Sequence, residues 1–395
     1  MLTAITKNRE LYCLLYPESK EKLMKIRGKT PLYCPQCYEE VIVKIGKIKI
    51  PHFAHKTNTK CTSSEPESER HLQGKIDLFS WLKAQRLNVE MEKFFPEINQ
   101  RSDLYVQKHG KKYAIEFQCS AIPIEEIEKR TEGYSSIDIV PVWLLGGEPY
   151  QKKFTLIDNV FKVSDFQWSL AQYNSTNGMH IYSYSPETKN ITILSHLAPI
   201  SIRKVFAQQM TYPLASVDFP LNLPNKNDKK FDWNFWFHEK KNMLRNKIIY
   251  ASNLKDSFLA TAYYNRHSPI LFPPLIGIPV KFMEICKTHV SIWQYFIWCD
   301  SFKHLNKGNE TSLALVVGKF EERVLNGDIQ LRKFPLIHVE FLKQMIYHYL
   351  KLLSKFGYLE ETRKGRFAMN KSIPFPNNIE EAARMENEFM NTFYK

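Results

Sequence analysis

The chain has 395 residues, of which 44% are hydrophobic, and it carries 55 Lys and Arg against 41 Asp and Glu, a net charge of +14. This length predicts two to three domains, each with enough apolar residues for a sizeable core. No apolar run approaches the roughly 18 residues of a membrane span, and the first residues lack the basic and apolar regions of a signal peptide, so we expect a cytoplasmic protein.

The composition favours a polyanionic partner. With 20 Tyr, 26 Phe and 7 Trp in a basic chain, Lys and Arg can meet phosphates while aromatic rings stack on bases. The seven cysteines are odd in number and only three of them are clustered. This favours thiols or a metal site in a reducing compartment over a disulfide framework.

Residues 1–65 are expected to form a β-rich, zinc-ribbon-like module, with paired strands at 2–5 and 11–15, a short helix at 17–26, and two short strands at 40–44 and 47–51. A Cys-Pro-Gln-Cys turn and a later His-Phe-Ala-His run flank these two strands. Tetrahedral Zn²⁺ needs four ligands, and the hairpin would bring the two groups together. The predicted structural zinc site consists of Cys34, Cys37, His55 and Cys61, with His52 as a substitute for one of them. Alternatively, the cysteines are plain thiols and the histidines contact DNA or the core.

Residues 66–150 follow a polar link at 56–68 and are expected to fold as an αβββαβ core with a mixed sheet. Asp103 and Glu116 lie on neighbouring predicted strands, thirteen residues apart, with a turn at 109–111. Two carboxylates and a backbone carbonyl, here that of Phe117, suffice for Mg²⁺ or Mn²⁺, which polarises a phosphate and activates water. The pair also recurs by chance in unrelated proteins.

Two predicted helices carry further candidates. Glu67, His71 and Lys75 are spaced i, i+4, i+8 and share one face of a helix at 67–86. We expect Glu67 to supplement the metal site and the other two to meet the phosphate, although a solvated face, and a capping box with Ser64, explain the same pattern. Arg130 and Tyr134 share a face of the helix at 123–134 and suit either a DNA backbone or plain solvent.

This D…E-x-Q arrangement resembles the PD-(D/E)xK nuclease superfamily, and together with the Cys-Pro-x-Cys…His-Phe-Ala-His…Cys series it resembles the competence protein CoiA family of Gram-positive bacteria. The resemblance implies that Asp103, Glu116 and Gln118 hold the metal and catalytic positions. Gln118 stands where the superfamily has lysine. A glutamine can orient water by hydrogen bonds but brings no positive charge.

The second half is expected to contain an accessory or linker region at 151–230 and a mostly helical domain at 231–395. The first should hold a hairpin of 181–184 with 191–194, a helix at 200–210 and a linker at 222–230. The aromatic stripe that begins at Trp233, Trp236 and Phe237 is expected to be core, with a stacking platform for single strands as the alternative. A helix at 339–356 followed by a hairpin at 357–369 resembles a winged helix, whose wing would present Arg363, Lys364 and Arg366 to DNA, unless it is an ordinary surface hairpin.

The sequence therefore predicts an α/β protein with a zinc module, a nuclease-like core and a helical C-terminal domain with a winged-helix element. The resemblance implies a role in competence, processing single-stranded, duplex or branched DNA by metal-dependent hydrolysis, with a recombinase or other competence proteins as partners. A non-catalytic DNA clamp or recombinase loader is the alternative, and a restriction-type defence nuclease a third.

Overall fold

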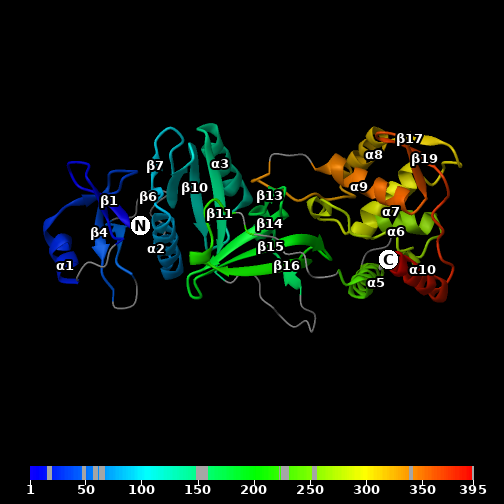
Figure 1. Ribbon diagram of the computed structural model, residues 1–395, viewed down its shortest axis with the longest axis horizontal. Coiled ribbons are helices and arrows are strands. Elements are labelled where there is room, and N and C mark those ends of the chain that lie inside the picture. The colour runs from blue at the N-terminus through cyan, green and yellow to red at the C-terminus, as the bar shows by residue number, and fades with distance from the viewer. Residues whose placement is uncertain are drawn as a thin grey trace.

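The computed structural model describes residues 1–15, 20–46, 50–56, 61, 67–147, 159–221, 223, 231–250, 256–337 and 341–393. The molecule is elongated, with a small N-terminal module at one end, a twisted sheet in the middle and a helical domain at the other end (Figure 1). None of the helices in these described parts combines the length and apolar character that a membrane span requires. The predicted linker at 222–230, except Leu223, and most of the polar link at 56–68 lie outside the described residues.

The N-terminal module is a five-stranded sheet in the order β2-β1-β3-β4-β5. Alternation in β4 buries Val41 and Val43 on one face. Most of the predicted strand at 47–51 lies outside the described residues. The strand that pairs with β4 is His52–His55, so both candidate histidines lie in a strand. The elements are β1 (Thr3–Ile5), β2 (Leu11–Cys13), α1 (Lys20–Lys29), β3 (Leu32–Tyr33), β4 (Glu40–Lys44) and β5 (His52–His55).

The middle of the chain confirms the predicted αβββαβ order. Strand β10 pairs antiparallel with β9 and parallel with β11, so the sheet is mixed. The elements are α2 (Glu69–Ala84), β6 (Asn88–Met91), the short hairpin β7 (Phe94–Phe95) and β8 (Gln100–Arg101), β9 (Leu104–Lys108), β10 (Lys111–Gln118), α3 (Ile124–Ser136) and β11 (Ile139–Gly146). The predicted first strand at 89–95 is interrupted, because Glu92 has a left-handed backbone with φ 51° and ends β6.

The same sheet continues through residues 160–213, in the order β12-β16-β15-β14-β11-β10-β9-β6. The predicted hairpin is confirmed, with Ile181 opposite Leu194. The predicted helix at 200–210 is wrong: Val205 and Ala207 are buried on alternate positions of a strand that pairs with β15. The elements are β12 (Val160–Lys162), α4 (Asp165–Ser169), β13 (Gln172–Asn174), β14 (Gly178–Ser185), β15 (Asn190–Pro199), β16 (Lys204–Pro213) and η2 (Leu214–Ser216).

The C-terminal domain is helical and contains the expected winged-helix element. Helix α7, strand β17, helices α8 and α9 and the hairpin β18–β19 follow one another, and the three strands form one sheet in the order β17-β19-β18. Trp233, Trp236 and Phe237 are buried, so they belong to the core and not to a stacking platform. The elements are α5 (Trp233–Tyr250), α6 (Ser257–Tyr264), η3 (Pro269–Leu271), η4 (Met283–Ile285), α7 (Val290–Ser301), β17 (Glu310–Ser312), α8 (Leu313–Leu325), α9 (Leu342–Lys355), β18 (Leu359–Arg363), β19 (Arg366–Met369) and α10 (Ile379–Phe393).

Candidate functional site

The N-terminal module brings together four metal-ligating side chains. The ligand atoms of Cys34, Cys37, His55 and Cys61 all lie within 4.8 Å of one another. The Cys37 Sγ is 3.3 Å from His55 Nε2, and Cys34 Sγ is 4.0 Å from Cys61 Sγ. His52 is not in this group, and its Nδ1 lies 2.8 Å from the Ile50 carbonyl oxygen. Three thiols and one imidazole match the donors that tetrahedral Zn²⁺ prefers.

The electrostatics of this Cys₃His cluster also fit a cation. Burial raises the pKa of the Cys37 thiol to about 12 and raises that of Cys34. Thiols in such surroundings ionise only beside a positive charge, which a bound Zn²⁺ would provide.

A second cluster lies where α2 meets the central sheet. The ligand atoms of Glu67, His71 and Asp103 are all within 4.8 Å of one another. Helix α2 begins at Glu69, and the Ser68 side chain caps it by accepting a hydrogen bond from the His71 backbone N–H at 3.2 Å. Ser68 is therefore the N-cap, in place of the predicted Ser64, and Glu67 precedes the helix.

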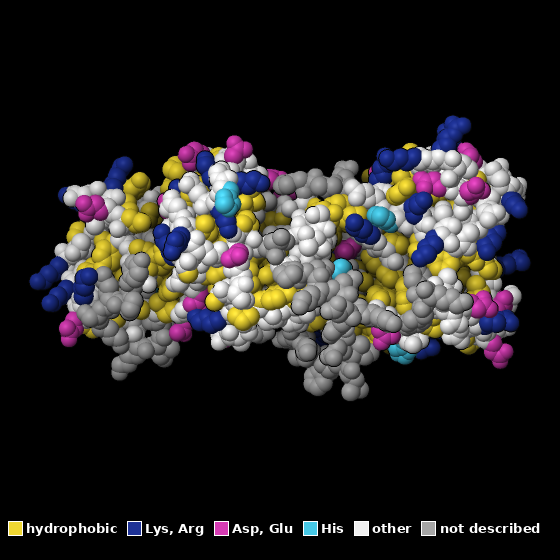
Figure 2. Space-filling view, in the orientation of Figure 1, with side chains coloured by type: hydrophobic (Ala, Val, Ile, Leu, Met, Phe, Trp, Pro, Cys, Tyr) yellow, Lys and Arg dark blue, Asp and Glu magenta, His cyan; other side chains and the backbone are white. Residues whose placement is uncertain are grey.

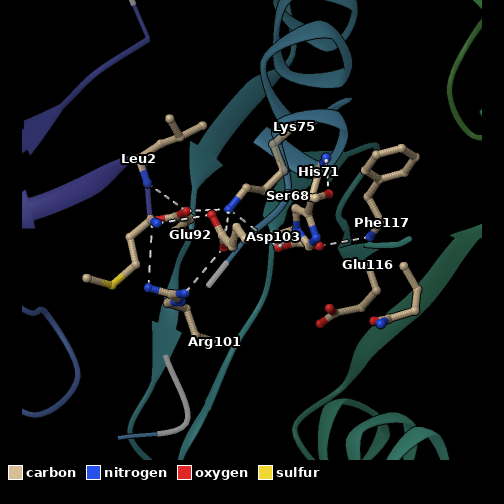
Figure 3. Close-up of polar contacts among 12 residues, drawn as sticks. Leu2, Ser68, His71, Lys75, Glu92, Arg101, Asp103, Glu116 and Phe117 are labelled. Carbon is tan, nitrogen blue, oxygen red and sulfur yellow. Dashed lines mark hydrogen bonds and ion pairs between the residues drawn. The ribbon is translucent and has the colours of Figure 1, made fainter. Parts of the chain in front are cut away.

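Close packing of α2 on β10 positions this cluster. At Gly74 a Cβ atom would lie 2.0 Å from the Phe117 ring, so only glycine allows this approach. As a result, His71 Nε2 comes within 3.1 Å of Asp103 Oδ1, while Asp103 Oδ2 accepts a hydrogen bond of 2.9 Å from the Phe117 backbone N–H (Figure 3).

Asp103 is held ionised in this arrangement. Burial alone would raise its pKa, but His71, Lys75 and the Phe117 N–H outweigh burial and hold the pKa well below its usual range. In the same way burial disfavours the His71 imidazolium, yet the Asp103 carboxylate outweighs burial and raises the His71 pKa. The pair therefore offers a permanent negative charge beside an imidazole.

Lys75 differs from its predicted role. Its side chain is 0% exposed, and its Nζ donates to Glu67 Oε1 at 2.7 Å and to Glu92 Oε1 at 2.5 Å (Figure 3). A side chain that is fully buried cannot contact a bound phosphate. Lys75 lies 3.9 Å from Asp103 and serves as the buried counter-charge of the acidic cluster.

Two charged residues of this network escaped the sequence analysis. Glu92 accepts hydrogen bonds from the Leu2 and Thr3 backbone N–H groups, at 2.9 and 3.0 Å, and so joins the N-terminal module to the central sheet. Arg101 lies 3.7 Å from Glu92 and 4.0 Å from Glu67. The sequence gives little signal for either residue, because Glu92 stands in the mixed run Val-Glu-Met-Glu-Lys at 89–93 and Arg101 lies in a polar turn region.

Glu116 lies on β10 but has partners that the sequence did not predict. Arg130 donates to its Oε1 at 2.5 Å, and the Tyr134 hydroxyl donates to the same oxygen. Burial, the largest effect, and the nearby Asp103 charge raise the Glu116 pKa above its ordinary value. Glu116 is not among the three side chains that cluster within 4.8 Å at Asp103, which are Glu67, His71 and Asp103 itself. The Asp103–Glu116 ligand pair stays a prediction, with Glu116 close enough for the Asp103 charge to raise its pKa.

The helix α3 residues are correspondingly not free for DNA. Tyr134 is 0% exposed, so the predicted contact with a DNA backbone does not fit its position. The Arg130 side chain, 24% exposed, is engaged with Glu116. Gln118, at the end of β10, donates a hydrogen bond of 2.8 Å to the Ser120 carbonyl. On the wing, Arg363, Lys364 and Arg366 are exposed, as predicted.

A mixed sheet flanked by helices, with an acidic cluster between its first helix and its central strands, defines a nuclease-like α/β protein with an added Cys₃His module. Three family models agree with this class: "Competence protein CoiA, N-terminal domain" matches residues 15–64, "Competence protein CoiA, nuclease-like domain" residues 67–227, and "Competence protein CoiA, C-terminal domain" residues 231–383. The chain belongs to the competence protein CoiA family.

Individual proteins show the same relationship. The chain is 29% identical over 366 residues to "Competence protein CoiA" of Bacillus subtilis (strain 168), an alignment that covers 91% of this chain and 94% of the relative. No solved structure matches this chain.

Proposed function

We propose that this protein is a metal-dependent DNA nuclease that processes incoming DNA during genetic competence, in the cytoplasm. The observation that carries the proposal is the Glu67–His71–Asp103 cluster, whose ligand atoms converge at the junction of α2 and the central strands. The family's nuclease-like domain over residues 67–227 and its role in competence support it.

The donor set suits Mn²⁺ or Mg²⁺. Two carboxylates are hard oxygen ligands, and the His71 imidazole favours Mn²⁺ over Mg²⁺, which prefers oxygen alone. When bound, such an ion polarises a phosphodiester and lowers the pKa of a coordinated water. The protein's own part is to hold Asp103 ionised and oriented through the Phe117 N–H, and to keep Glu67 charged through Lys75.

Other side chains complete the proposed chemistry. The pKa of Glu116 lies above its ordinary value, chiefly because the carboxyl is buried, and a shift in this direction makes it a stronger proton acceptor. Gln118, two residues further on, orients the attacking water by hydrogen bonds. The Arg130 guanidinium, paired with Glu116, supplies a positive charge at the strand that also carries Gln118 in the position where the superfamily has a lysine.

The C-terminal domain provides the DNA-binding surface. The wing presents Arg363, Lys364 and Arg366, all exposed, to a phosphate backbone. Lys343 and Lys355 are exposed on α9, the helix that precedes the wing. Together with the net charge of +14, these residues favour binding of DNA that contains a duplex, either free DNA or DNA held by a recombinase.

A non-catalytic DNA clamp with a nuclease fold is the second candidate. It is favoured by Gln118 in the lysine position, by the complete burial of Lys75, and by the engagement of Arg130 with Glu116. A clamp would bind DNA without needing the acidic cluster.

A cleavage assay separates the two candidates. Labelled single-stranded, duplex and branched DNA would be incubated with Mn²⁺ or Mg²⁺ and either wild type, Asp103→Asn or the matched control Asp77→Asn, whose carboxylate contacts Tyr184 and Lys189 away from the cluster. The nuclease proposal expects cutting by wild type and the control only, with DNA binding retained by all three. Equal DNA binding with no cutting by any of them would favour the clamp.

A further inference from the structure

A cavity of about 590 Å³ lies between the extended sheet and the helical domain. Its walls come from β13 to β16 on one side and from residues 279–284 before and within η4 on the other. In Figure 2 hydrophobic side chains gather in this region, between the sheet and the helical domain. The volume falls within the range of small-molecule sites, which favour such junctions between domains. None of the residues assigned to metal or DNA above lines it.

Aromatic rings form two of the walls. Phe206 and Phe231 pack with ring centroids 4.8 Å apart, and Tyr173 and Phe282 with centroids 5.9 Å apart. The plane of Phe282 is fixed, because the ring stacks on Phe341 at 4.3 Å with an interplanar angle of 6°. Rigid aromatic faces of this kind bind flat, unsaturated rings.

The rim of the cavity is polar and cationic. Ser175, Thr176, His196 and Lys281 are exposed lining residues, and they supply hydroxyl, imidazole and ammonium groups. Lys281 Nζ lies 5.0 Å from the centroid of the Phe282 ring, so the positive charge stands next to an aromatic wall. A ligand that matches this lining has a flat ring inside and an anionic group at the mouth.

The backbone around the cavity is strained at several positions. Asn159, His196 and Phe282 have left-handed φ angles of 90°, 53° and 69°, and all three line the cavity. His196 also sits in a bulge of β15, where the pairing with β16 shifts between Ser195 and Ala198. Non-glycine residues adopt such conformations at a cost and are concentrated at binding sites, where bulges re-aim side chains.

The winged-helix element adjoins this cavity. Phe341, the ring stacked on Phe282, immediately precedes α9, and His348 on α9 has its ring centroid 5.8 Å from that of Phe282. The helix that carries the predicted DNA contacts is therefore packed against one wall of the cavity.

We propose that this cavity binds one nucleotide unit, with the base between the aromatic walls and the phosphate at Lys281 and His196. The identification of the source as a DNA strand rests on the proposed function; a free nucleotide has the same chemistry. Stacking on aromatic rings accepts any base, and a base already unpaired enters a pocket at the lowest cost.

Photo-crosslinking of the full chain tests the inference. One arm uses a single-stranded oligodeoxynucleotide containing 5-iodouracil, the other uses free 5-iodo-deoxyuridine monophosphate, and the modified peptides are mapped by mass spectrometry. Thr176→Trp places a bulky ring at the exposed mouth, and Ala215→Trp adds the same ring at an exposed residue that does not line the cavity. Circular dichroism checks that both variants fold.

Crosslinks at the rings of the cavity are expected in wild type and Ala215→Trp, and a roughly tenfold weaker yield in Thr176→Trp, the size that loss of one stacked base implies. Crosslinks from both probes or from either alone support the site and identify the source of the nucleotide. Crosslinks confined to other peptides, or a yield that Thr176→Trp leaves unchanged, would overturn it. Because the readout is binding at a mapped position, a failed cleavage assay does not decide the result.

Discussion

The buried counter-charge at the acidic cluster makes a quantitative prediction for Lys75→Met. Methionine keeps the apolar stem of the side chain but removes a cation that contacts Glu67 at 2.7 Å and Glu92 at 2.5 Å, with 0% of its side chain exposed. Both carboxylates then lose their closest cation, and the cation that remains near both of them is the more distant Arg101, at 3.7 Å from Glu92 and 4.0 Å from Glu67. Removing one member of a buried pair costs about 3–5 kcal/mol. The matched control is Lys189→Met, whose ion pair with Asp77 leaves the lysine 57% exposed and is worth about 0–1 kcal/mol.

Hydrogen exchange followed by mass spectrometry is the suitable assay, because a chain with several domains need not unfold in one step. The free energy of opening would be measured for peptides within α2 and β9–β10. We expect a fall of about 3–5 kcal/mol for Lys75→Met and of at most about 1 kcal/mol for Lys189→Met. Equal protection of the wild type and Lys75→Met would refute the assignment of Lys75 as the charge that the cluster requires.

Three further predictions concern the other sites. His55→Ala should lose bound zinc while His52→Ala retains it, as measured by atomic absorption, because only His55 joins the three cysteines; zinc loss in His52→Ala alone would contradict this ligand set. Burial raises the pKa of Glu284 to about 7, so the folded state holds a proton that the unfolded state releases, and wild-type stability should fall as pH rises from about 4.5 through 7. Glu284→Gln, which mimics the neutral acid, should match wild type at pH 4 and exceed it by about 3 kcal/mol at pH 8 in the free energy of opening that hydrogen exchange gives for peptides around residue 284; a parallel pH dependence of the two proteins would contradict it. Neutralising the wing should weaken the binding of duplex DNA of any sequence. The slope of log K against log salt should fall by about 0.9 for each DNA phosphate that the wing no longer neutralises. An unchanged slope would show that the wing does not contact the DNA backbone. The residues to replace by alanine are Arg363, Lys364 and Arg366.

The sequence predicted those features that depend on local pattern. The αβββαβ order followed from strand-like runs and turn residues, and the winged-helix hairpin from an amphipathic helix followed by Gly357 and a turn at Gly365, both of which have positive φ. The Cys₃His group followed from the spacing of its residues. The helix expected at 200–210 failed because a short run with mixed polarity fits period 2 as well as period 3.6, and pairing with β15 decided in favour of a strand.

The candidate metal site was predicted only in part, because long-range packing sets its charges. The sequence placed Glu67, His71 and Lys75 on one face of a helix. Glu67 and His71 are candidate ligands, whereas Lys75 is a fully buried counter-ion, and this difference depends on the positions of Glu92 and Arg101. Likewise, nothing local shows that Arg130 and Tyr134 fold back onto Glu116. In the sequence, polar side chains that form hydrogen bonds or ion pairs with a distant element cannot be distinguished from polar side chains that face solvent.

The measurement that tests the account most directly is Mn²⁺ binding followed by electron paramagnetic resonance on the full chain. If Glu67, His71 and Asp103 form the metal site, wild type and Asp77→Asn should bind one Mn²⁺ there, and Asp103→Asn should lose it. Mn²⁺ binding that Asp103→Asn leaves intact, or no binding by wild type, would contradict a divalent-metal site in this cluster and with it the proposed nuclease.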